Sequence, residues 1–375
     1  MRENGPLLHK AHTGATFPFV PDRKRQADEL RQQTAELDLE LLALLEKRAR
    51  AARRLGELRR DQAPQLPLSD AKAIRNLVAK STGDMPEAAL FDIFREISGA
   101  CLTLELPVKV GYVGLEGGPG HSAACGRFGR GASLLGVETA GAAIDEVLRR
   151  RAEFAVVPFE TSIEGPVQST IVALMASDLR IAEMIDATFD LHLVSRTGAA
   201  ADVETVYATP ADHALCERLL AHHEPALAVV DVRSPRIACD LAAGEPGAAA
   251  VANEAFAAPF GLVVARRSIL DRAGDRVRYA VVSARPSGRT GQDVTSLVFT
   301  VGDAAGSLLD VLRVLAERGI NLTNIESHPV RGEAWSYLFY IELAGHFTDR
   351  PLVSAFEEIK RRTRSFKVLG SYPAP

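Results

Sequence analysis

Residues 295–329 read TSLVFTVGDAAGSLLDVLRVLAERGINLTNIESHP, in which an apolar strand-like run is followed by a helical run and a second strand-like run. Residues 335–373 continue with a strand, a helix and a strand. The order β-α-β-β-α-β within about 80 residues is the ferredoxin-like pattern. We therefore expect residues 293–375 to form a small domain of their own.

The preceding region, residues 107–285, has a different composition. Short β-branched runs alternate in it with helical stretches such as GAAIDEVLRRRAE; the runs are VKVGYVG, FAVVPFE, LHLVS, TVYAT, LAVVDV, AAAVAN and YAVVS. Such alternation predicts an α/β region with largely buried strands, and its length of about 180 residues favours two lobes. The segment ARPSGRTGQD, residues 284–293, predicts a linker by its Gly, Pro and Ser content.

Residues 22–105 predict an all-helical domain. Over about forty residues from Asp22, glycine and proline are absent except for Gly56, and leucines recur at steps of three and four residues. One helix of this length spans roughly 55 Å, more than a small domain needs, so we expect it to pair with a second copy of itself. Residues 1–21 form a tail without an interpretable pattern.

The composition excludes several classes of partner. The 375-residue chain has a net charge of -4 and a pI near 6.2, so its overall charge gives no reason to bind nucleic acid or an anionic membrane. No run approaches the roughly 18 apolar residues of a spanning helix, and the first residues lack a signal peptide's apolar stretch, so a cytoplasmic location is expected. Four widely separated cysteines predict buried thiols. We expect no metal or organic cofactor.

Three arginines of the long helix form a candidate anion site. Arg48 and Arg59 are eleven residues apart, which places them within about 20° of one helix face, and Arg31 points about 100° away. This arrangement is typical of a site that a partner's helix completes. The alternative is chance alignment, because eleven Lys and Arg residues lie between positions 23 and 60.

The helical region resembles a known domain. ELRQQTAELDLELLALLEKRARAARRLGELRR and FREISGACLTLE are similar to the chorismate mutase domain at the front of bifunctional chorismate mutase–prephenate dehydratases. The resemblance implies that arginines clamp the two carboxylates of chorismate, Arg31 from the partner subunit and Arg48 and Arg59 from the same one. It places Glu105 opposite the ether oxygen, where negative charge grows. The rearrangement is pericyclic, so positioning and electrostatics would supply the acceleration.

The α/β region carries further motifs of the same family. VGYVGLEGGPGHSAA resembles its GPEGT segment, VVPFETSIEG resembles VVPxENSxEG, VYATPADHALC resembles YSHPQALAQC, and SPRIAC occupies a position that normally has Ser-Thr-Ala. The resemblance implies catalytic roles for Ser162 and Glu164. It implies substrate-binding roles for Glu116, Gly117, Glu160, Thr161, Thr209 and Ser234.

Several positions depart from the family pattern. Gly118 and Gly120 stand where hydroxyl residues are usual, and they would form either an anion-cradling turn or a plain tight turn. Arg236 in SPRIAC is unexpected. The family has a lysine at position 59. The remaining departures, on which the activity of the two sites depends, are Ser69, Asp70, Ile163, Thr209 and Val277.

The segment RVRYAVVS, residues 276–283, resembles the family's TRF strand. By this resemblance the threonine protonates the departing ring hydroxyl of prephenate, but the position is held here by Val277, which has no proton to donate. General acid catalysis contributes about 10²–10⁴-fold, so the substitution predicts slower turnover. Arg278 matches the family's carboxylate-binding arginine; its alternative is a solvent-facing strand arginine. An anion clamp without the acid predicts a site that binds a prephenate-like dicarboxylate.

The C-terminal domain resembles the ACT domain, the amino-acid sensor of these enzymes. DAAGSLLDVL and NIESHP match the family's GAL and ESRP motifs, with histidine in place of the arginine. Such domains usually pair and hold phenylalanine between them. The residues that the resemblance assigns to effector binding are Gly306, Ser307, Leu308, Glu326, Ser327 and His328.

Three hypotheses of function follow. The first is a homodimeric or homotetrameric enzyme of phenylalanine biosynthesis that converts chorismate to prephenate and prephenate to phenylpyruvate, with inhibition by phenylalanine. The second is a related enzyme such as a prephenate decarboxylase, which would keep Arg278 and discard the hydroxyl donor. The third is a non-catalytic protein that senses aromatic amino acids through residues 293–375.

Overall fold

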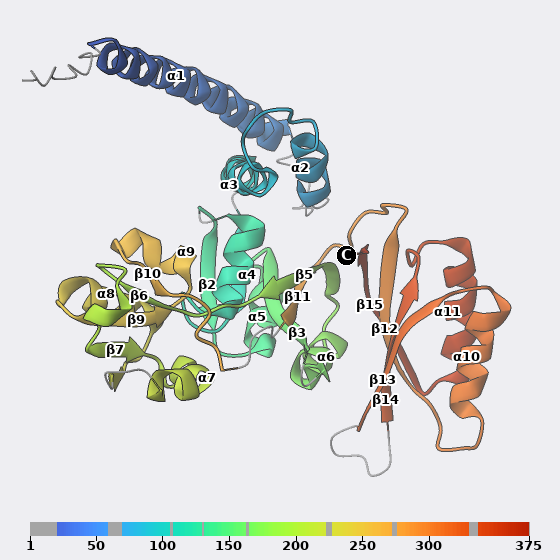
Figure 1. Cartoon of the computed structure of the whole chain (residues 1–375). Coiled ribbons are helices and arrows are strands. Elements are labelled where there is room, and N and C mark those ends of the chain that lie inside the picture. Colours follow the sequence, from blue (N-terminus) through green and yellow to red (C-terminus); the bar gives the residue numbers. More distant parts are fainter. Residues whose placement is uncertain are drawn as a thin grey trace, which may run out of the picture. The chain divides into compact units, whose positions relative to one another are not determined.

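The computed structural model describes residues 21–58, 70–105, 108–129, 131–162, 165–222, 227–271, 276–329 and 337–374 (Figure 1). The chain divides into two compact units, residues 1–51 and 52–375. Arg59, Ser69, Ile163 and Glu164 lie outside the described residues, and so does the tail before residue 21.

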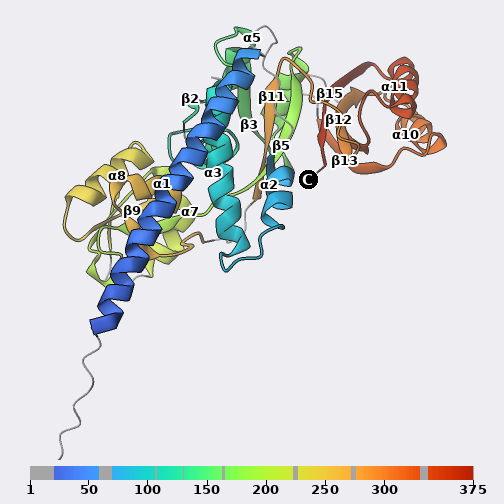
Figure 2. The same cartoon turned by 90° about the horizontal axis from the view of Figure 1, so that it is seen from above.

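The first unit consists of most of one long helix. α1 (Pro21–Leu58) runs without a break for 38 residues, which confirms the single long helix expected from the leucine spacing (Figure 2). Leucines at positions 30, 37, 41 and 44 of this helix are 52 to 63% exposed. An apolar stripe of this kind is typical of a helix that packs against a partner.

Two shorter helices complete the helical region. α2 (Asp70–Val78) buries Ile74 and Val78, and α3 (Glu87–Glu105) buries Leu102. α3 approaches the next domain closely, because a Cβ added to Gly99 would lie 2.9 Å from the Cα of Gly129. The expected all-helical segment ahead of the α/β region is therefore confirmed.

The first lobe of the α/β region is a sheet with helices on both faces. Its strands are β1 (Lys109–Val113), β2 (Ser133–Val137), β3 (Phe154–Thr161), the two-residue β4 (Gly165–Pro166), β5 (Arg180–Thr188) and β11 (Arg276–Ser283). Its helices are α4 (Pro119–Phe128), α5 (Ala140–Leu148) and α6 (Gln168–Met175). Residues of α4 belong to the core on one face, and residues of α5 and α6 belong to the core on the other.

The second lobe has a five-stranded sheet in the order β10-β6-β9-β7-β8. The strands are β6 (His192–Ser195), β7 (Thr205–Ala208), β8 (Ala228–Asp231), β9 (Ala248–Ala252) and β10 (Val263–Arg266). The α-helices of this lobe are α7 (Pro210–Ala221), α8 (Pro235–Gly244) and α9 (Glu254–Ala257). Two short 3₁₀ helices, η1 (Ala200–Asp202) and η2 (Ala258–Phe260), complete it. Two cores pack on this sheet, so the prediction of a two-lobed α/β region is confirmed.

The C-terminal domain has the expected ferredoxin-like order. The elements are β12 (Asp293–Thr300), α10 (Ser307–Glu317), β13 (Leu322–Pro329), β14 (Tyr337–Ala344), α11 (Arg350–Arg362) and β15 (Ser365–Pro373). α10 and α11 cover one face of the sheet β13-β14-β12-β15 (Figure 1). The other face contributes Leu338, Tyr340 and Tyr372 to the core of the first lobe.

The C-terminal domain extends the sheet of the first lobe. β15 pairs with β5 at Gly370 and Ile181, which joins the two sheets into one of ten strands. A Cβ on Gly370 would lie 2.1 Å from the carbonyl oxygen of Ile181, so the close approach at this joint requires glycine.

The described residues contain neither a membrane-spanning helix nor a metal-binding cluster. No described helix is long and apolar enough to cross a membrane, and no group of three His, Cys, Asp or Glu side chains in the described ranges could hold a metal ion. Cys216 and Cys239 are buried as expected, while Cys101 and Cys125 are half-buried. Burial raises the pKa of the Cys216 and Cys239 thiols to about 12, so both stay protonated and unreactive.

Candidate active site

The candidate site begins at one edge of the first-lobe sheet. β1 and β3 are parallel, and β5 runs in the same direction because both β3 and β5 are antiparallel to β11. The carboxyl ends of these strands therefore meet at one edge, where β11 starts. Ligands of open α/β sheets bind outside such an edge. We call this edge the site edge.

A bulge in β3 decides which side chains share a face at the site edge. The pairing of β3 with β11 shifts by one residue between Arg278 and Tyr279, so that Glu160 lies opposite Arg278 and Thr161 lies opposite Val277. Val277 also pairs with Ala187 on β5. Such bulges re-aim side chains by inserting one residue into a strand.

Val277 and Arg278 therefore point to opposite faces of the sheet. Val277 is half-buried and packs against the apolar cluster that contains Tyr112 and Ala124, on the α4 side. The backbone N–H of Ser162 donates to the carbonyl of Arg276 at 2.9 Å, so the neighbouring pair of Thr161 and Val277 is a non-hydrogen-bonded pair. In such pairs the Cα atoms are about 4.5 Å apart and the side chains are in contact range.

Ser162 lies at the end of the pairing between β3 and β11. Its Oγ accepts from the backbone N–H of Arg276 at 3.0 Å, and its side chain is exposed. The structure thus places two predicted site residues, Thr161 and Ser162, beside the position of Val277.

The loop between β1 and α4 reaches the second lobe. Gly114 and Gly117 have φ angles of 108° and 89°, and a Cβ on Gly117 would lie 2.7 Å from the ring of Phe256 in the second lobe. Gly118 is the N-cap of α4 and supplies no side-chain cap. Gly120 lies within the helix, and its Cβ would be 2.1 Å from the carbonyl oxygen of Val113. The unusual glycine at 120 therefore serves the packing of α4 on β1.

Arg236, which was unexpected from the sequence, links the two lobes. Its Nη1 lies 3.1 Å from Oε1 of Glu116, and its guanidinium stands 5.8 Å from the centroid of the Phe260 ring. Glu116, a predicted substrate ligand, is thus ion-paired in this arrangement. Both side chains are about half-exposed, at 56% and 47%, so the pair is open to a ligand from solvent.

His121 is a candidate that the sequence motifs did not single out. Its ring lies between Tyr112 at 5.3 Å and Phe256 of the second lobe at 5.9 Å, measured between centroids. Its Nε2 is 3.5 Å from the Cys125 sulfur. Burial, Glu116 and Cys125 raise the pKa of Tyr112, so its phenol stays protonated. A histidine in the first turn of the helix after a glycine-rich loop is the signal that could have drawn attention to this position.

The predicted site residues of the second lobe are helix caps. Thr209 is the N-cap of α7, directly after the carboxyl end of β7, and Ser234 is the N-cap of α8, three residues after the carboxyl end of the parallel strand β8. The Thr209 hydroxyl donates to Asp212 at 2.7 Å, and the Ser234 hydroxyl accepts from the N–H of Ile237. Their contact with substrate stays a prediction.

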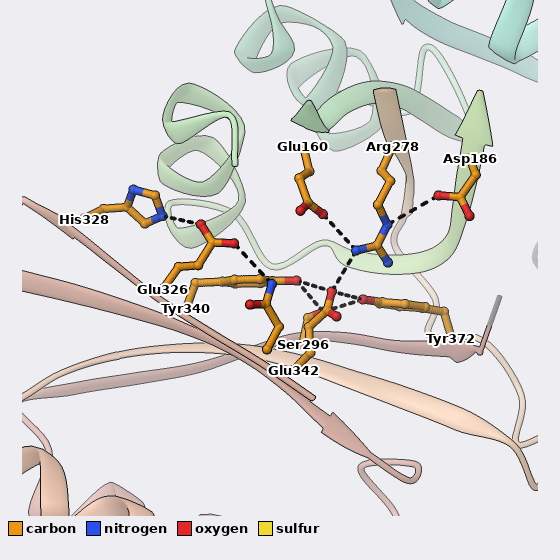
Figure 3. Close-up of polar contacts among 10 residues, drawn as sticks. Glu160, Asp186, Arg278, Ser296, Glu326, His328, Tyr340, Glu342 and Tyr372 are labelled. Atoms are coloured by element: carbon orange, nitrogen blue, oxygen red, sulfur yellow. Dashed lines mark hydrogen bonds and ion pairs between the residues drawn. The ribbon is translucent and has the colours of Figure 1, made fainter. Parts of the chain in front are cut away.

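Arg278 lies among carboxylates where the first lobe meets the C-terminal domain (Figure 3). Its guanidinium is 2.8 Å from Glu160, 3.5 Å from Asp186 and 3.3 Å from Glu342 of β14. Burial alone would lower the pKa of Arg278, but Glu342 and Glu160 raise it above the usual arginine value. A substrate carboxylate would have to displace one of these partners, so the predicted anion clamp requires a rearrangement.

The predicted effector residues lie on two elements of the C-terminal domain. Gly306, with a φ of 89°, is the N-cap of α10, and Ser307 and Leu308 begin that helix. Glu326 and His328 lie on β13 with 3.6 Å between their Oε2 and Nε2 atoms. The same strand touches the first lobe, because the side chain of Gln168 donates to the carbonyl of Pro329 at 2.9 Å.

The structure describes only some of the residues that the sequence predicts for the chorismate mutase site. Arg31 is exposed and paired with Asp28 at 2.9 Å, and Arg48 is exposed on α1. Glu105 is half-buried at the end of α3, where a Cβ on Gly56 would meet its carbonyl oxygen at 2.2 Å. Arg59 and Ser69 fall outside the described residues, so their predicted roles have no structural account.

Comparison with known proteins assigns the chain to a family. Three family models match in order: chorismate mutase type II over residues 30–106, prephenate dehydratase over 110–287, and the ACT domain over 295–361. A bifunctional chorismate mutase/prephenate dehydratase of Aquifex aeolicus is 37% identical over 92% of this chain and 97% of its own length. The chain belongs to the bifunctional chorismate mutase/prephenate dehydratase family.

Other members of this family, and a solved structure, agree. The bifunctional chorismate mutase/prephenate dehydratase of Pseudomonas aeruginosa is 31% identical over 93% of this chain and 98% of its own length. The crystal structure of prephenate dehydratase from Arthrobacter aurescens in complex with L-Phe covers 71% of this chain and 90% of its own, with 28% identity and a TM-score of 0.59. The sequence resemblance of the helical, α/β and ACT regions to this family is therefore confirmed.

Proposed function

We propose that the protein is a bifunctional enzyme that rearranges chorismate to prephenate and converts prephenate to phenylpyruvate, with feedback inhibition by phenylalanine. The observation that carries the proposal is the match of all three family models in order, together with a bifunctional relative that is 37% identical over 97% of its own length.

In the dehydratase step one carbon–carbon bond breaks to release carbon dioxide. Its electron pair enters the ring, and the bond to the ring hydroxyl breaks at the opposite carbon. The hydroxyl leaves as water once it has received a proton, so a general acid near the leaving group lowers the barrier. Val277 supplies none.

Thr161 lies opposite Val277 at the site edge, and its hydroxyl is our candidate for the missing acid. The two residues are directly paired across β3 and β11 and share the face that α4 covers. Thr161 is half-buried, so it can recover a proton from solvent. Relative to the family pattern, the hydroxyl has moved from position 277 to the neighbouring strand. Ser162 and the interlobe pair of Glu116 and Arg236 would orient the substrate.

For the mutase step the protein needs cations and no nucleophile. Arg31 and Arg48 on α1 would hold the substrate carboxylates, with Arg31 contributed by a second copy of the chain, and Glu105 would face the ether oxygen. A pericyclic reaction gains from fixed geometry and from charge placed where charge develops. The exposed leucine stripe of α1 supports the pairing of two copies that this site requires.

Product analysis tests the proposal. The purified protein is incubated with chorismate and separately with prephenate, and the products are identified. We expect phenylpyruvate well above the spontaneous rate. A decarboxylated product that keeps the ring hydroxyl would show a prephenate decarboxylase instead, the activity that the apolar surroundings of Val277 favour. Unchanged substrates would show a non-catalytic protein.

A further inference from the structure

Arg278 of β11 contacts side chains from three other strands, and these strands belong to two domains. Glu160 on β3 and Asp186 on β5 belong to the same lobe as Arg278, whereas Glu342 belongs to the C-terminal domain (Figure 3). The side chain of Glu342 is 10% exposed and that of Arg278 is 22% exposed. Solvent screens a pair of this kind less than a surface pair.

The C-terminal domain fixes the position of the Glu342 carboxylate. The hydroxyls of Tyr340 and Tyr372 donate to Oε1 of Glu342 at 2.6 and 3.2 Å, and the same oxygen meets Arg278. Ser296 lies within 2.5 Å of the Tyr372 hydroxyl and 3.0 Å of the Tyr340 hydroxyl. All three of these side chains are buried. The carboxylate therefore has little freedom to move apart from the sheet that carries it.

The predicted effector strand is next to this carboxylate. In the pairing of β13 with β14, Asn324 lies opposite Glu342 and Glu326 lies opposite Tyr340. The Asn324 side chain donates to Glu326 at 3.2 Å. β13 therefore pairs directly with β14, the strand that carries Glu342, so a shift of β13 would move this carboxylate.

Arg278, the partner of Glu342 in this ion pair, lies beside the candidate active site. Arg278 follows Val277 directly on β11, and its partner Glu160 precedes Thr161 directly on β3. The ring of Phe159, in the same bulge, is 5.4 Å from the ring of Tyr340. Movement of Arg278 or of the bulge would change the distance between the side chains at positions 161 and 277.

We propose that the ion pair of Glu342 and Arg278 is the positioning contact through which the C-terminal domain sets the geometry of the site edge. Glu342 is a positioning residue: it holds Arg278, and Arg278 holds the two strand ends that carry Thr161 and Val277. An effector bound beside β13 would act on the reaction by moving Glu342. The inference rests on the proposed function in one respect, namely that these strand ends serve the dehydratase reaction.

The test uses the full-length chain and three variants. Glu342→Gln removes the charge but keeps an oxygen that accepts from both tyrosines. Tyr372→Phe removes one of the two hydroxyls that fix Glu342. Asp186→Asn is the matched control, because it takes one carboxylate from Arg278 without altering the C-terminal domain. For each protein we measure hydrogen exchange of the backbone amides, the affinity for phenylalanine and the inhibition of phenylpyruvate formation.

We expect Glu342→Gln to speed amide exchange at residues 160–162 and 276–278 in the absence of any ligand. We expect it to bind phenylalanine with an unchanged Kd, yet to need at least about fivefold more phenylalanine for half-inhibition. Tyr372→Phe should show the same changes to a smaller extent. Asp186→Asn should be inhibited as the wild type is.

Two results would overturn the inference: unchanged amide exchange at both strand ends in Glu342→Gln, or an equal loss of inhibition in Asp186→Asn. Failure of the proposed function gives a different result. If the wild type forms no phenylpyruvate, or binds no phenylalanine, the exchange of residues 160–162 and 276–278 still decides whether Glu342 positions the site edge.

Discussion

At the scale of single residues, we expect the reaction to depend most on the pair of Val277 and Thr161. The two face each other across β11 and β3, one without and one with a hydroxyl. Arg278, next in sequence to Val277, points to the opposite face and contacts three carboxylates. The proposed acid, Thr161, and the cation, Arg278, therefore lie on opposite faces of the sheet.

Restoring a hydroxyl at position 277 should speed the reaction. Val277→Thr has nearly the same shape as the wild type and adds a second donor beside the substrate. We expect kcat for phenylpyruvate formation to rise by about tenfold, with KM unchanged within about twofold. Steady-state kinetics with prephenate measures this change. Val277→Ala is the control, and equal rates for the threonine and alanine variants would contradict our account of this position.

Removing the neighbouring hydroxyl should have the opposite effect. We expect Thr161→Val to lower kcat by about 10²-fold, because general acid catalysis is lost, while Thr161→Ser keeps most of the rate. The double variant Thr161→Val/Val277→Thr should regain activity, since it returns the hydroxyl to β11. A Thr161→Val enzyme with the wild-type kcat would exclude Thr161 as the donor.

At the scale of elements, the placement of α4 depends on one glycine. The helix packs so closely on β1 that a Cβ on Gly120 would lie 2.1 Å from a backbone oxygen, whereas a Cβ on Gly126 of the same helix would have nothing within 4 Å. The two glycines are therefore a matched pair for testing the packing.

We expect Gly120→Ala to destabilise the first lobe by about 1–3 kcal/mol, because the backbone cannot move aside without shifting the helix. Gly126→Ala should stabilise it by about 0.5–1 kcal/mol, because alanine loses less conformational entropy in a helix. Thermal unfolding midpoints of the two variants and the wild type measure the difference. Midpoints that shift in the same direction would show that α4 is not packed as described.

The cap of α7 predicts a pH-dependent stability of the second lobe. Asp212 is 8% exposed, and burial raises its pKa above the ordinary value of 3.8, although the hydrogen bond from Thr209 lowers it in part. The folded protein thus holds this proton more tightly than the unfolded chain, and stability is lost as the pH rises through the raised pKa. Asp212→Asn removes this titration. At each pH we subtract the thermal unfolding midpoint of the wild type from that of the variant. We expect this difference to increase from pH 4 to pH 7. A difference that stays constant would contradict the prediction.

At the scale of the whole molecule, the exposed leucines of α1 predict that the long helix packs against a second copy of the chain. Leu37 and Leu41 of α1 are 57% and 52% exposed in a single chain, and burying an arginine in their place would be costly. We expect Leu37→Arg/Leu41→Arg to reduce the oligomer that sedimentation detects and to abolish mutase activity, since the partner's Arg31 is lost from the site. Gln32→Arg, roughly 160° around the same helix, is the control. An unchanged mass in the double variant would place the subunit interface elsewhere.

The sequence predicted the order of the elements well because that order rests on local patterns. In the α/β region it missed β2, β4, β5 and β10. The strand β5 includes charged residues that interrupt the apolar pattern. Glu183 of β5 is 9% exposed and accepts from Arg127 at 2.6 Å, a partner 56 residues away. Local periodicity carries no information on such pairs. The contact between Arg236 and Glu116 could not be predicted for the same reason, because these residues are 120 positions apart in the sequence.

The sequence by itself determined the family, the three regions and the absence of a hydroxyl at position 277, because motifs and apolar spacing are properties of contiguous residues. Only the tertiary structure decided which side chains share a face. The bulge in β3 pairs Thr161 with Val277, and the joint at Gly370 accompanies the contact of Glu342 with Arg278. Register and domain contacts arise between residues far apart in the chain, so the neighbours of Val277 and Arg278 could be identified only after the chain had folded.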